Sequence, residues 1–369
     1  MSGHLLDIVR ELLFPDRDRR AIPMLDGPMR PNSRLDQCTV LSTAITAPDD
    51  IAITSEGVPY VTSGNRVYRF ADLNFDQHTI VAEFDGLATS LALHPDGGVV
   101  VAVADQGVAF LDGPHSGRML QISGSQGLKC PTAITVSEVG DIFICDGSLF
   151  NSKDRWAHDL MQKGRSGRVL RIDGRTEQVD ILVCDLSYPN GICIASDGKS
   201  LIVCEAWSHD ILRIPMTPTG GWKRQTVIEN LPGYPARIVA TSTGYCLALF
   251  ALRTQLVDFV LTEDNYRRKM VERVDPMFWI APALKSEGHY LEPVQGAGLR
   301  KHGKLKAWAP PRSYGLMVIL DIELEVEDSL HSRVGGSCHG VTGLAQYKGE
   351  IFLASKGDNK VVRAMGGMQ

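Results

Sequence analysis

The sequence predicts an all-β fold, a six-bladed β-propeller built from four-stranded blades. Three observations favour it: a strand pattern recurs six times along the 369 residues, every copy has a glycine at its first turn, and a spare strand precedes the first copy. Apolar and polar residues alternate within the copies, which is typical of strands with one buried face. Four-stranded sheets repeated around an axis form a propeller, in which neighbouring blades bury each other's apolar faces.

Each copy contains a strand, a glycine turn and a second strand, and a third strand follows directly or after an insertion. The first copy reads PDDIAITSEGVPYVTSGNRVYRF and the sixth reads VTGLAQYKGEIFLASKGDNKVVRA. The copies begin at Pro48, Ala88, Pro131, Pro189, Pro235 and Val341, and their turn glycines are Gly57, Gly97, Gly140, Gly198, Gly244 and Gly349.

The last copy ends after three strands, at Ala364, and the segment CTVLSTA at residues 38–44 is left over. We expect this segment to close the ring as the outer strand of blade six, because it would cover an exposed sheet edge. The domain organisation is then one propeller over 37–369, preceded by an N-terminal helix and arm over 1–36. The helix is predicted from an apolar stripe that ends before Pro15 and consists of Leu5, Leu6, Val9, Leu12 and Leu13.

Two long insertions interrupt the repeat, a first insertion at 150–166 and a second insertion at 252–312. Both follow the second strand of a blade, so both are expected on the same face of the propeller. Long loops on one face of a rigid scaffold usually carry function. We therefore predict that they form a lid over one mouth of the central channel.

Composition and charge exclude several classes of function. Hydrophobic residues are 44% and charged residues 22%, which is an ordinary globular balance. The formal net charge is −5 and no block of lysine and arginine occurs, so neither a nucleic acid nor an anionic membrane is an expected partner. There is no apolar run near 18 residues and no secretory signal, and the eight cysteines contain no CxxC pair. These features predict a cytoplasmic protein with reduced cysteines.

Small polar residues recur where the inner strand of each copy begins. A ring of such residues around the channel could hold a cation or the polar atoms of a substrate, and it could equally line a water-filled channel. In two copies the next residue along the chain is charged: Asp50 follows the ring residue of the first copy, and Arg237 follows that of the fifth. The ring consists of Asp49, Thr89, Thr132, Asn190, Ala236 and Thr342.

Further polar candidates lie at the ends of second strands and before the sixth inner strand. Asp146 and Glu205 could act as acid or base, or could pair with arginines such as Arg165 and Arg253. Among the histidines, His339 is expected closest to the ring, and His289 and His302 fall in the second insertion. No GxSxG elbow is present, so a serine triad of that type is not predicted.

The succession GRVLRID, YPNG, SDGKSLIVCE and LPGYP, between residues 167 and 235, resembles the strictosidine-synthase-like proteins. Across the repeat, the chain is more weakly similar to the paraoxonases and to the gluconolactonase and luciferin-regenerating superfamily. This resemblance implies a six-bladed propeller with a small-molecule site at the channel mouth.

The resemblance also implies a set of site residues. Hydrolytic members hold a divalent cation, usually calcium, with acidic and amide side chains of the ring. Only Asp49 and Asn190 match that set; Thr132 and Ala236 do not, and Arg237 brings a positive charge. We therefore expect no cofactor, with calcium or another divalent cation on Asp49 and Asn190 as the alternative. The glutamate of strictosidine synthase corresponds to Thr342, with His339 nearby.

We expect an enzyme that acts on a small organic molecule at the channel mouth, with hydrolysis of a lactone or ester as the first hypothesis. In it Asp49 is the base or water holder, and Asn190 and Arg237 stabilise an oxyanion. A metal-free lyase, cyclase or condensing enzyme is the second hypothesis, with Arg237 binding a carboxylate and Asp49 or His339 moving protons. A binding propeller without chemistry is the third. The expected catalytic residues are Asp49 and His339, and the expected binding residues are Asn190, Arg237, Thr132, Thr89, Thr342, Asp146, Glu205, Trp207 and His209.

Overall fold

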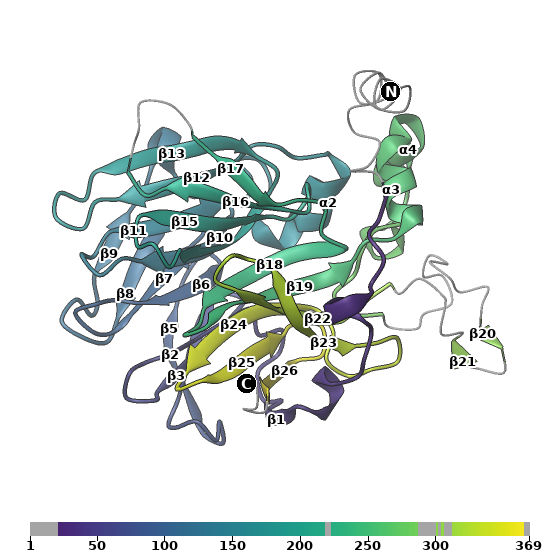
Figure 1. The fold of residues 1–369 in the computed structure, drawn as a ribbon. Helices are drawn as coiled ribbons and strands as arrows, with labels where there is room; N and C mark the ends of the chain where they lie inside the picture. Colours follow the sequence, from purple (N-terminus) through teal and green to yellow (C-terminus); the bar gives the residue numbers. More distant parts are fainter. Residues whose placement is uncertain (1–20, 218–222, 287–299, 302–303, 306–311, 365–369) are drawn as a thin grey trace, which may run out of the picture.

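The computed structural model describes residues 21–217, 223–286, 300–301, 304–305 and 312–364 (Figure 1). The predicted N-terminal helix, His289 and His302 lie outside these residues.

Six four-stranded antiparallel sheets confirm the predicted propeller. Within each blade, the strands follow one another from the channel outwards. Blade one contains β2 (Asp50–Ile53), β3 (Pro59–Ser63), β4 (Arg66–Phe70) and β5 (His78–Glu83), and blade two contains β6 (Ala88–Leu93), β7 (Val99–Val103), β8 (Gly107–Leu111) and β9 (Met119–Gln121). Blade three contains β10 (Pro131–Val136), β11 (Ile142–Asp146), β12 (Gly167–Ile172) and β13 (Val179–Leu186), and blade four contains β14 (Pro189–Ile194), β15 (Ser200–Glu205), β16 (Asp210–Pro215) and β17 (Gln225–Ile228). Blade five contains β18 (Gly233–Ala240), β19 (Gly244–Leu252), β22 (Gly315–Asp321) and β23 (Val326–Ser332), and blade six contains β24 (Val341–Tyr347), β25 (Glu350–Ser355), β26 (Lys360–Ala364) and β1 (Thr39–Ser42).

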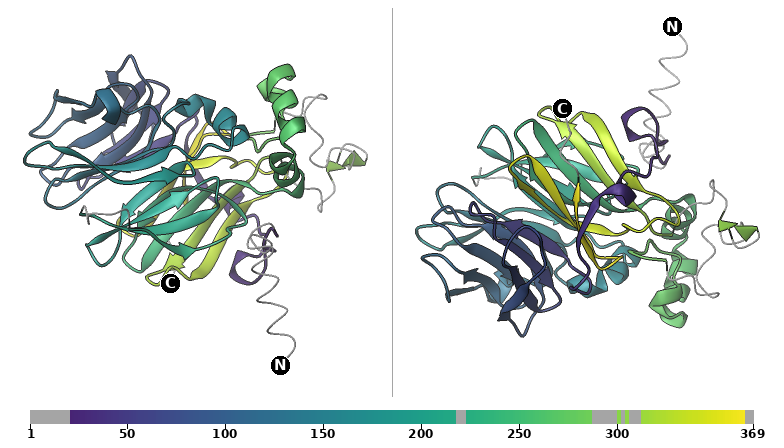
Figure 2. Two further views of the ribbon diagram at one scale, coloured as in Figure 1. Left: turned by 90° about the horizontal axis from the view of Figure 1, so that it is seen from above. Right: turned by 90° about the horizontal axis from the view of Figure 1, so that it is seen from below.

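The N-terminal strand closes the ring as predicted. Strand β1 pairs antiparallel with β26, so the last blade is completed by residues from the other end of the chain. The arm before it carries two short 3-10 helices, η2 (Gly27–Met29) and η3 (Leu35–Gln37), and runs beside blades five and six (Figure 2). Asp36 fixes the arm there, because its Oδ1 accepts hydrogen bonds from Ser332 Oγ and from the Ser337 amide.

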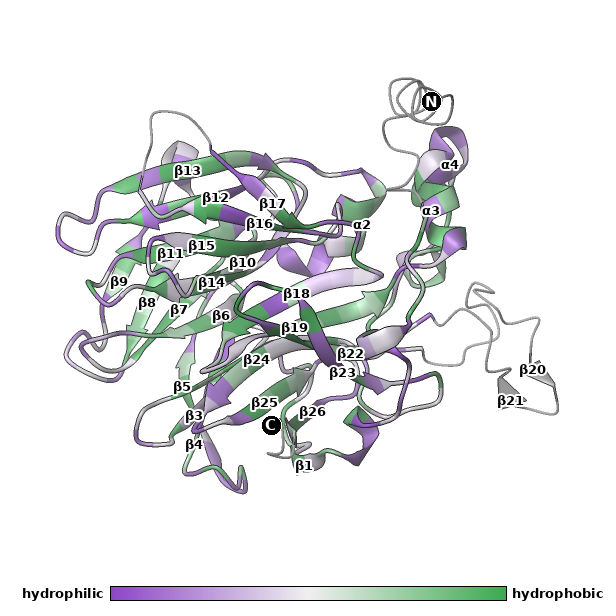
Figure 3. Ribbon diagram, viewed as in Figure 1, coloured by the Kyte–Doolittle hydropathy of each residue, from purple (hydrophilic) through white to green (hydrophobic). Residues whose placement is uncertain are grey.

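The core lies between neighbouring blades, where the apolar faces of their sheets pack together. All residues of β7 and of β19 are buried. The apolar stretches of the blade strands appear as green bands in Figure 3. All eight cysteines are free, and six of them are buried among apolar side chains, as expected for small hydrophobic residues.

At the start of the inner strands the pairing is irregular, and the ring residues there have no partner on the neighbouring strand. In β10, Thr132 is the extra residue between Pro131 and Ala133, which pair with consecutive partners on β11. Such a bulge re-aims a side chain and strengthens the local twist. The pairing shifts in the same way at Thr89, Asn190 and Thr342.

Blade five differs from this pattern. In β18 the pairing jumps from Pro235 to Ile238, so Ala236 and Arg237 together face one residue of β19. The wider bulge brings the side chain of Arg237 into the channel mouth, whereas Ala236 is buried. The ring position that the sequence assigned to an alanine is therefore taken by an arginine.

Both insertions carry short helices. The first insertion forms η5 (Lys153–Arg155) and α2 (Trp156–Met161), and the second forms α3 (Gln255–Thr262), α4 (Asp264–Arg273), η6 (Pro276–Phe278) and the hairpin of β20 (Arg300–Lys301) and β21 (Lys304–Leu305). No helix in the described part of the chain has the length and apolar character needed to span a bilayer.

Candidate functional site

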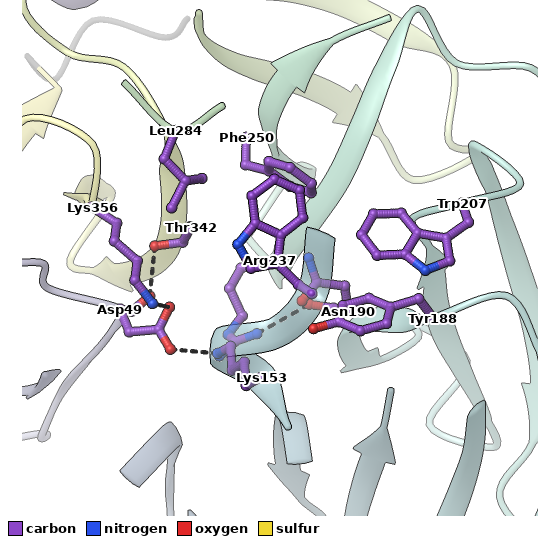
Figure 4. A pocket seen from close by; sticks show the side chains of 11 residues that line it. Asp49, Lys153, Tyr188, Asn190, Trp207, Arg237, Phe250, Leu284, Thr342 and Lys356 are labelled. Carbon is purple, nitrogen blue, oxygen red and sulfur yellow. Dashed lines mark hydrogen bonds and ion pairs between the residues drawn. The ribbon is translucent and has the colours of Figure 1, made fainter. Parts of the chain in front are cut away.

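A cavity opens at the channel mouth where the inner strands begin, and Figure 4 shows its lining. Water-sized molecules can enter about 40 Å³ of it, which is room for a few waters or for one end of a small ligand. The lining comes from blades one, four, five and six and from both insertions, and it consists of Asp49, Lys153, Trp156, Tyr188, Asn190, Trp207, Arg237, Phe250, Leu284, Thr342 and Lys356.

Asp49 is the centre of an ionic network on the floor of the cavity. Lys153 Nζ lies 2.5 Å from Asp49 Oδ2, and Lys356 Nζ lies 3.2 Å from Asp49 Oδ1 (Figure 4). The carboxylate is only 6% exposed. Oδ1 is buried and accepts no hydrogen bond from the described residues.

The pKa values of both the carboxylate and the amine are lowered, but for different reasons. Burial alone would raise the pKa of Asp49, but Lys153, Lys356 and Arg237 hold it well below its usual range. Burial lowers the pKa of Lys153 to about 8, with Arg237 and Lys356 adding to the effect and Asp49 opposing it. Asp49 is therefore a permanent anion, whereas Lys153 can gain and lose a proton near neutral pH.

Arg237 pairs with Asp50 and not with Asp49. Arg237 Nε lies 3.0 Å from Asp50 Oδ2, which also accepts a hydrogen bond from the Leu91 amide. The two other guanidinium nitrogens donate to the carbonyls of Asn190 and Thr89, each at 3.0 Å. Neighbouring residues of an extended chain point to opposite sides, so only one of the two aspartates can face this guanidinium.

Four aromatic side chains form one wall of the cavity. Tyr188 and Trp207 stack with ring centroids 4.4 Å apart, and Trp156 meets Phe250 edge to face at 5.4 Å. Such offset and edge-to-face pairs are favourable beyond the area they bury. The wall offers a flat apolar surface beside the charged floor.

The first insertion is held in place through Asp159. Its carboxylate accepts hydrogen bonds from Trp207 Nε1 at 2.9 Å and from Asn151 Nδ2 at 3.0 Å. A side chain at Gly164 would place its Cβ 2.0 Å from Asp159 Oδ1, so a larger residue there would displace this carboxylate. The same contacts hold α2 in place, and Lys153 of the preceding η5 reaches across to Asp49 before blade one.

The second insertion lies over the cavity at Leu284, so both insertions meet at one mouth, as their places in the repeat predict. The segment approaches blade six closely. A Cβ on Gly357 would lie 2.1 Å from the Leu284 carbonyl oxygen, and one on Gly340 would lie 2.8 Å from it. Glycine at these two positions allows the insertion to close over the channel.

Five of the residues expected from the sequence line the cavity: Asp49, Asn190, Arg237, Thr342 and Trp207. Thr89 and Thr132 do not; the Thr89 hydroxyl donates to the Ala102 carbonyl, and the Thr132 hydroxyl donates to those of Cys145 and Pro189. Asp146 is fully buried and paired with Arg168 at 3.0 Å, rather than with Arg165 or Arg253.

Glu205, His209 and His339 also lie outside the cavity lining. Glu205 accepts a hydrogen bond from the Ser187 amide. His209 is buried with its Nδ1 against the Gly233 carbonyl, and burial lowers its pKa to about 3, so it is neutral. His339 bridges Ser313 Oγ and the Arg333 carbonyl at the base of the second insertion, which is a position that orders a loop. The geometry therefore offers no contact between these three side chains and a ligand.

Sequence reasoning missed the two lysines. Lys356 directly follows the second strand of blade six, one residue beyond the position that supplied Asp146 and Glu205 as candidates in blades three and four. Lys153 had no comparable signal, because it lies in a charged, helix-like insertion 104 residues away from Asp49.

Comparison with known proteins confirms the resemblance. The sequence profile of the strictosidine synthase family matches residues 132–216. Adipocyte plasma membrane-associated protein of Danio rerio is 26% identical over 279 residues, which are 68% of this chain and 65% of that protein. Protein STRICTOSIDINE SYNTHASE-LIKE 6 of Arabidopsis thaliana is 28% identical over 162 residues, 43% of each chain. The chain thus spans at most about two thirds of the length of these relatives.

Two solved structures share the fold. A gluconolactonase from Xanthomonas campestris superposes with a TM-score of 0.55 at 11% identity, over 88% of this chain and 87% of that one. The calcium-binding protein regucalcin from Agrobacterium tumefaciens gives the same score and identity, over 88% and 92%. At this identity the likeness concerns the fold alone.

The residues at this mouth do not suit calcium, the ion that the fold relatives suggest. Calcium takes six to eight oxygen ligands and favours carboxylates that are free to bind it. Here Lys153 and Lys356 pair with Asp49, the one carboxylate among the described residues that line the cavity, and Arg237 supplies a third positive charge beside it. The absence of a cofactor stays a prediction.

Proposed function

We propose that this protein is an enzyme that acts on a small organic anion with an apolar, planar body. The observation that carries the proposal is Lys153, a buried amine with a pKa of about 8, at the floor of a cavity with an aromatic wall. Perturbed titratable groups in a cleft are typical of sites of proton transfer.

The charge balance of the cavity favours an anionic ligand. Lys153, Lys356 and Arg237 bring three positive charges, whereas Asp49 and the adjacent Asp50 bring two negative ones. While Lys153 is protonated, one positive charge is therefore left for the ligand. Lys356 is the cation best placed to receive it, since its side chain is 29% exposed and that of Arg237 only 7%.

Hydrolysis of a lactone or ester is the reaction we propose for this site. The neutral amine of Lys153 takes a proton from a water molecule as the water oxygen forms a bond to the carbonyl carbon, and the carbonyl electron pair moves to its oxygen. The ammonium of Lys356 and the amide of Asn190 stabilise this oxyanion. The carbonyl then re-forms, the bond to the alcohol oxygen breaks, and Lys153 returns its proton to that oxygen.

This assignment moves the base from Asp49 to Lys153. A carboxylate whose pKa is held so low accepts protons poorly, so Asp49 orients the amine and fixes its charge. Arg237 supports the floor, because Asp50 and two backbone carbonyls occupy its nitrogens.

A panel of aryl-substituted lactones and esters, with and without a carboxylate, tests the proposal with the full chain, with hydrolysis followed by proton release. We expect turnover of carboxylate-bearing members, and a loss of kcat of at least about 10²-fold in Lys153→Met. Lys163→Met is the matched control, because Lys163 lies in the same insertion and pairs with Asp264 on the surface.

The other two hypotheses predict different results in the same experiment. A binding propeller would bind 1-naphthoate, with loss of affinity in Lys356→Met, and hydrolyse no member of the panel. A condensing enzyme would leave the panel intact and join an arylethylamine to an aldehyde. Either outcome would replace hydrolysis as the proposed activity.

We also propose a cytoplasmic location with small molecules as partners, neither nucleic acid nor membrane. The eight free cysteines support a reducing compartment. Cell fractionation of the tagged full chain tests it, and co-sedimentation with membranes would contradict it.

A further inference from the structure

A second group of polar side chains lies at the rim of blade two, away from the cavity. His94 and Asp96 follow β6 in the turn before β7, and His115 lies in the loop between β8 and β9. Thr89, in the channel ring, is five residues before His94, so the strand separates the two places by roughly 16 Å. The group therefore lies on the face of the propeller opposite the channel mouth.

The three side chains converge. One ligand atom from each lies within 4.8 Å of the other two. His115 Nε2 is 3.0 Å from Asp96 Oδ2, and His94 Nδ1 is 3.8 Å from the same oxygen. Among the described residues, this is the one group of three histidine, cysteine or acidic side chains with such spacing.

Glycines bring the two loops together. A Cβ on Gly98 would lie 2.4 Å from the Asp112 carbonyl oxygen, and one on Gly113 would lie 2.4 Å from the Gly97 carbonyl oxygen. Both glycines also have positive φ angles, which favour glycine. The approach of the turn that carries His94 to the loop that carries His115 is thus built into the backbone.

The imidazoles are ordered and suited to bind a metal. The ring of His94 packs edge to face against Phe110 at 5.9 Å and against His115 at 4.7 Å. Its side chain is only 10% exposed. Imidazole nitrogen and carboxylate oxygen are both atoms that coordinate divalent transition metals.

We propose that His94, Asp96 and His115 bind one divalent transition metal ion, with zinc as the best fit. Zinc accepts imidazole nitrogen and carboxylate oxygen, and sites with three protein ligands keep a fourth position for water. The adjoining cavity, of which water-sized molecules can enter about 170 Å³, has room for that water. Small rotations of Asp96, whose side chain is 63% exposed, bring its oxygen within bonding distance.

One nearby charge opposes a cation. Arg118 lines the same cavity, but it pairs with Glu177 and its guanidinium lies over the Phe110 ring at 5.2 Å. Glu177 thus offsets the positive charge of Arg118. The metal would replace the bond that His94 Nδ1 accepts from the Asp96 amide, a long one at 3.2 Å.

Calorimetric titration of the metal-free full chain with zinc chloride tests the site. We expect one zinc ion per chain and a higher melting temperature with zinc. His115→Ala and Asp96→Asn should each weaken binding at least about tenfold, since even outer-shell partners of a metal change its affinity by that factor. His78→Ala is the control, because His78 is an exposed histidine on blade one, outside the group.

Two outcomes would overturn the proposal. One is the absence of zinc binding to the wild-type chain, and the other is binding that neither variant weakens relative to His78→Ala. Both substituted residues lie on exposed loops, so circular dichroism is expected to show folded proteins. If His115→Ala does not fold, Asp96→Asn alone decides.

Discussion

The substitution Asp49→Asn is expected to lower the pH at which Lys153 loses its proton. Asn keeps the size of the side chain and can still accept a hydrogen bond, but it removes the negative charge beside the amine. That charge is the interaction that raises the pKa of Lys153, against burial and the neighbouring cations. Without it, the neutral amine becomes the favoured form at a lower pH.

The separation of the two groups gives a lower bound for the change. At the 2.5 Å between Lys153 Nζ and Asp49 Oδ2, Coulomb's law with the dielectric constant of water, about 80, gives about 1.7 kcal/mol. One pH unit corresponds to about 1.4 kcal/mol. The transition should therefore move down by about one pH unit or more, because the cavity screens charges less than water does.

Labelling with acetic anhydride measures this without a substrate, because only the neutral amine reacts. Labelling of the Lys153 peptide is quantified by mass spectrometry between about pH 6 and about pH 10, around the usual range of a perturbed lysine. The peptide that contains Lys163 corrects for reagent decay in the same sample. Circular dichroism and a melting curve check that the variant is folded.

The wild-type transition is expected near pH 8, and that of Asp49→Asn clearly below it. A folded variant with an unchanged or higher transition would refute the reasoning, because Asp49 would then not control the charge of Lys153. Asp49 would in that case be an ordinary structural carboxylate, and the role of Lys153 would need another explanation.

The same geometry supports three further predictions. Gly357→Ala is expected to raise KM or weaken 1-naphthoate binding while the melting temperature changes little, because its Cβ would lie 2.1 Å from the Leu284 carbonyl. Unchanged affinity would show that the close approach of the second insertion to Gly357 does not matter for binding. Calcium chloride should leave the melting temperature and the activity unchanged, and elemental analysis should find far less than one calcium per chain; stoichiometric calcium lost together with activity on chelation would contradict the poor fit. The pKa of His209 is about 3 in the folded protein against 6.5 for the ordinary group, so the unfolded state binds more protons in that window and stability falls as the pH drops. Urea unfolding between about pH 6 and pH 4.5 should show a slope near 1.4 kcal/mol per pH unit from this residue, which His209→Gln abolishes; an equal slope in the variant would assign it to other groups.

The blades could be predicted because their signal is local. Period-two strands and a turn glycine recur within each copy, and the first two strands of each blade, which the glycine turn joins, are close in the sequence. The closing strand β1 was also predictable, since a missing fourth strand in one copy and a spare strand elsewhere leave one way to cover the edge.

The lining of the cavity was predicted only in part, and the reason is the bulge. Asp49, Asn190 and Thr342 follow the repeat, so their position at the start of the inner strand predicts that their side chains point into the channel mouth. In blade five the wider bulge exchanges Ala236 for Arg237, which depends on how β18 pairs with β19. No pattern in the sequence of β18 predicts that pairing.

By itself, the sequence determined the number of blades, their closure and the face on which both insertions meet. Only the tertiary structure decided which charges meet at the mouth, because Lys153 and Lys356 reach Asp49 from an insertion of blade three and from the end of β25. The same holds for His94, Asp96 and His115, which two loops bring together. The physical reason is that strand formation depends on neighbouring residues, whereas a pKa and a ligand set depend on distances between side chains that only the packed chain defines.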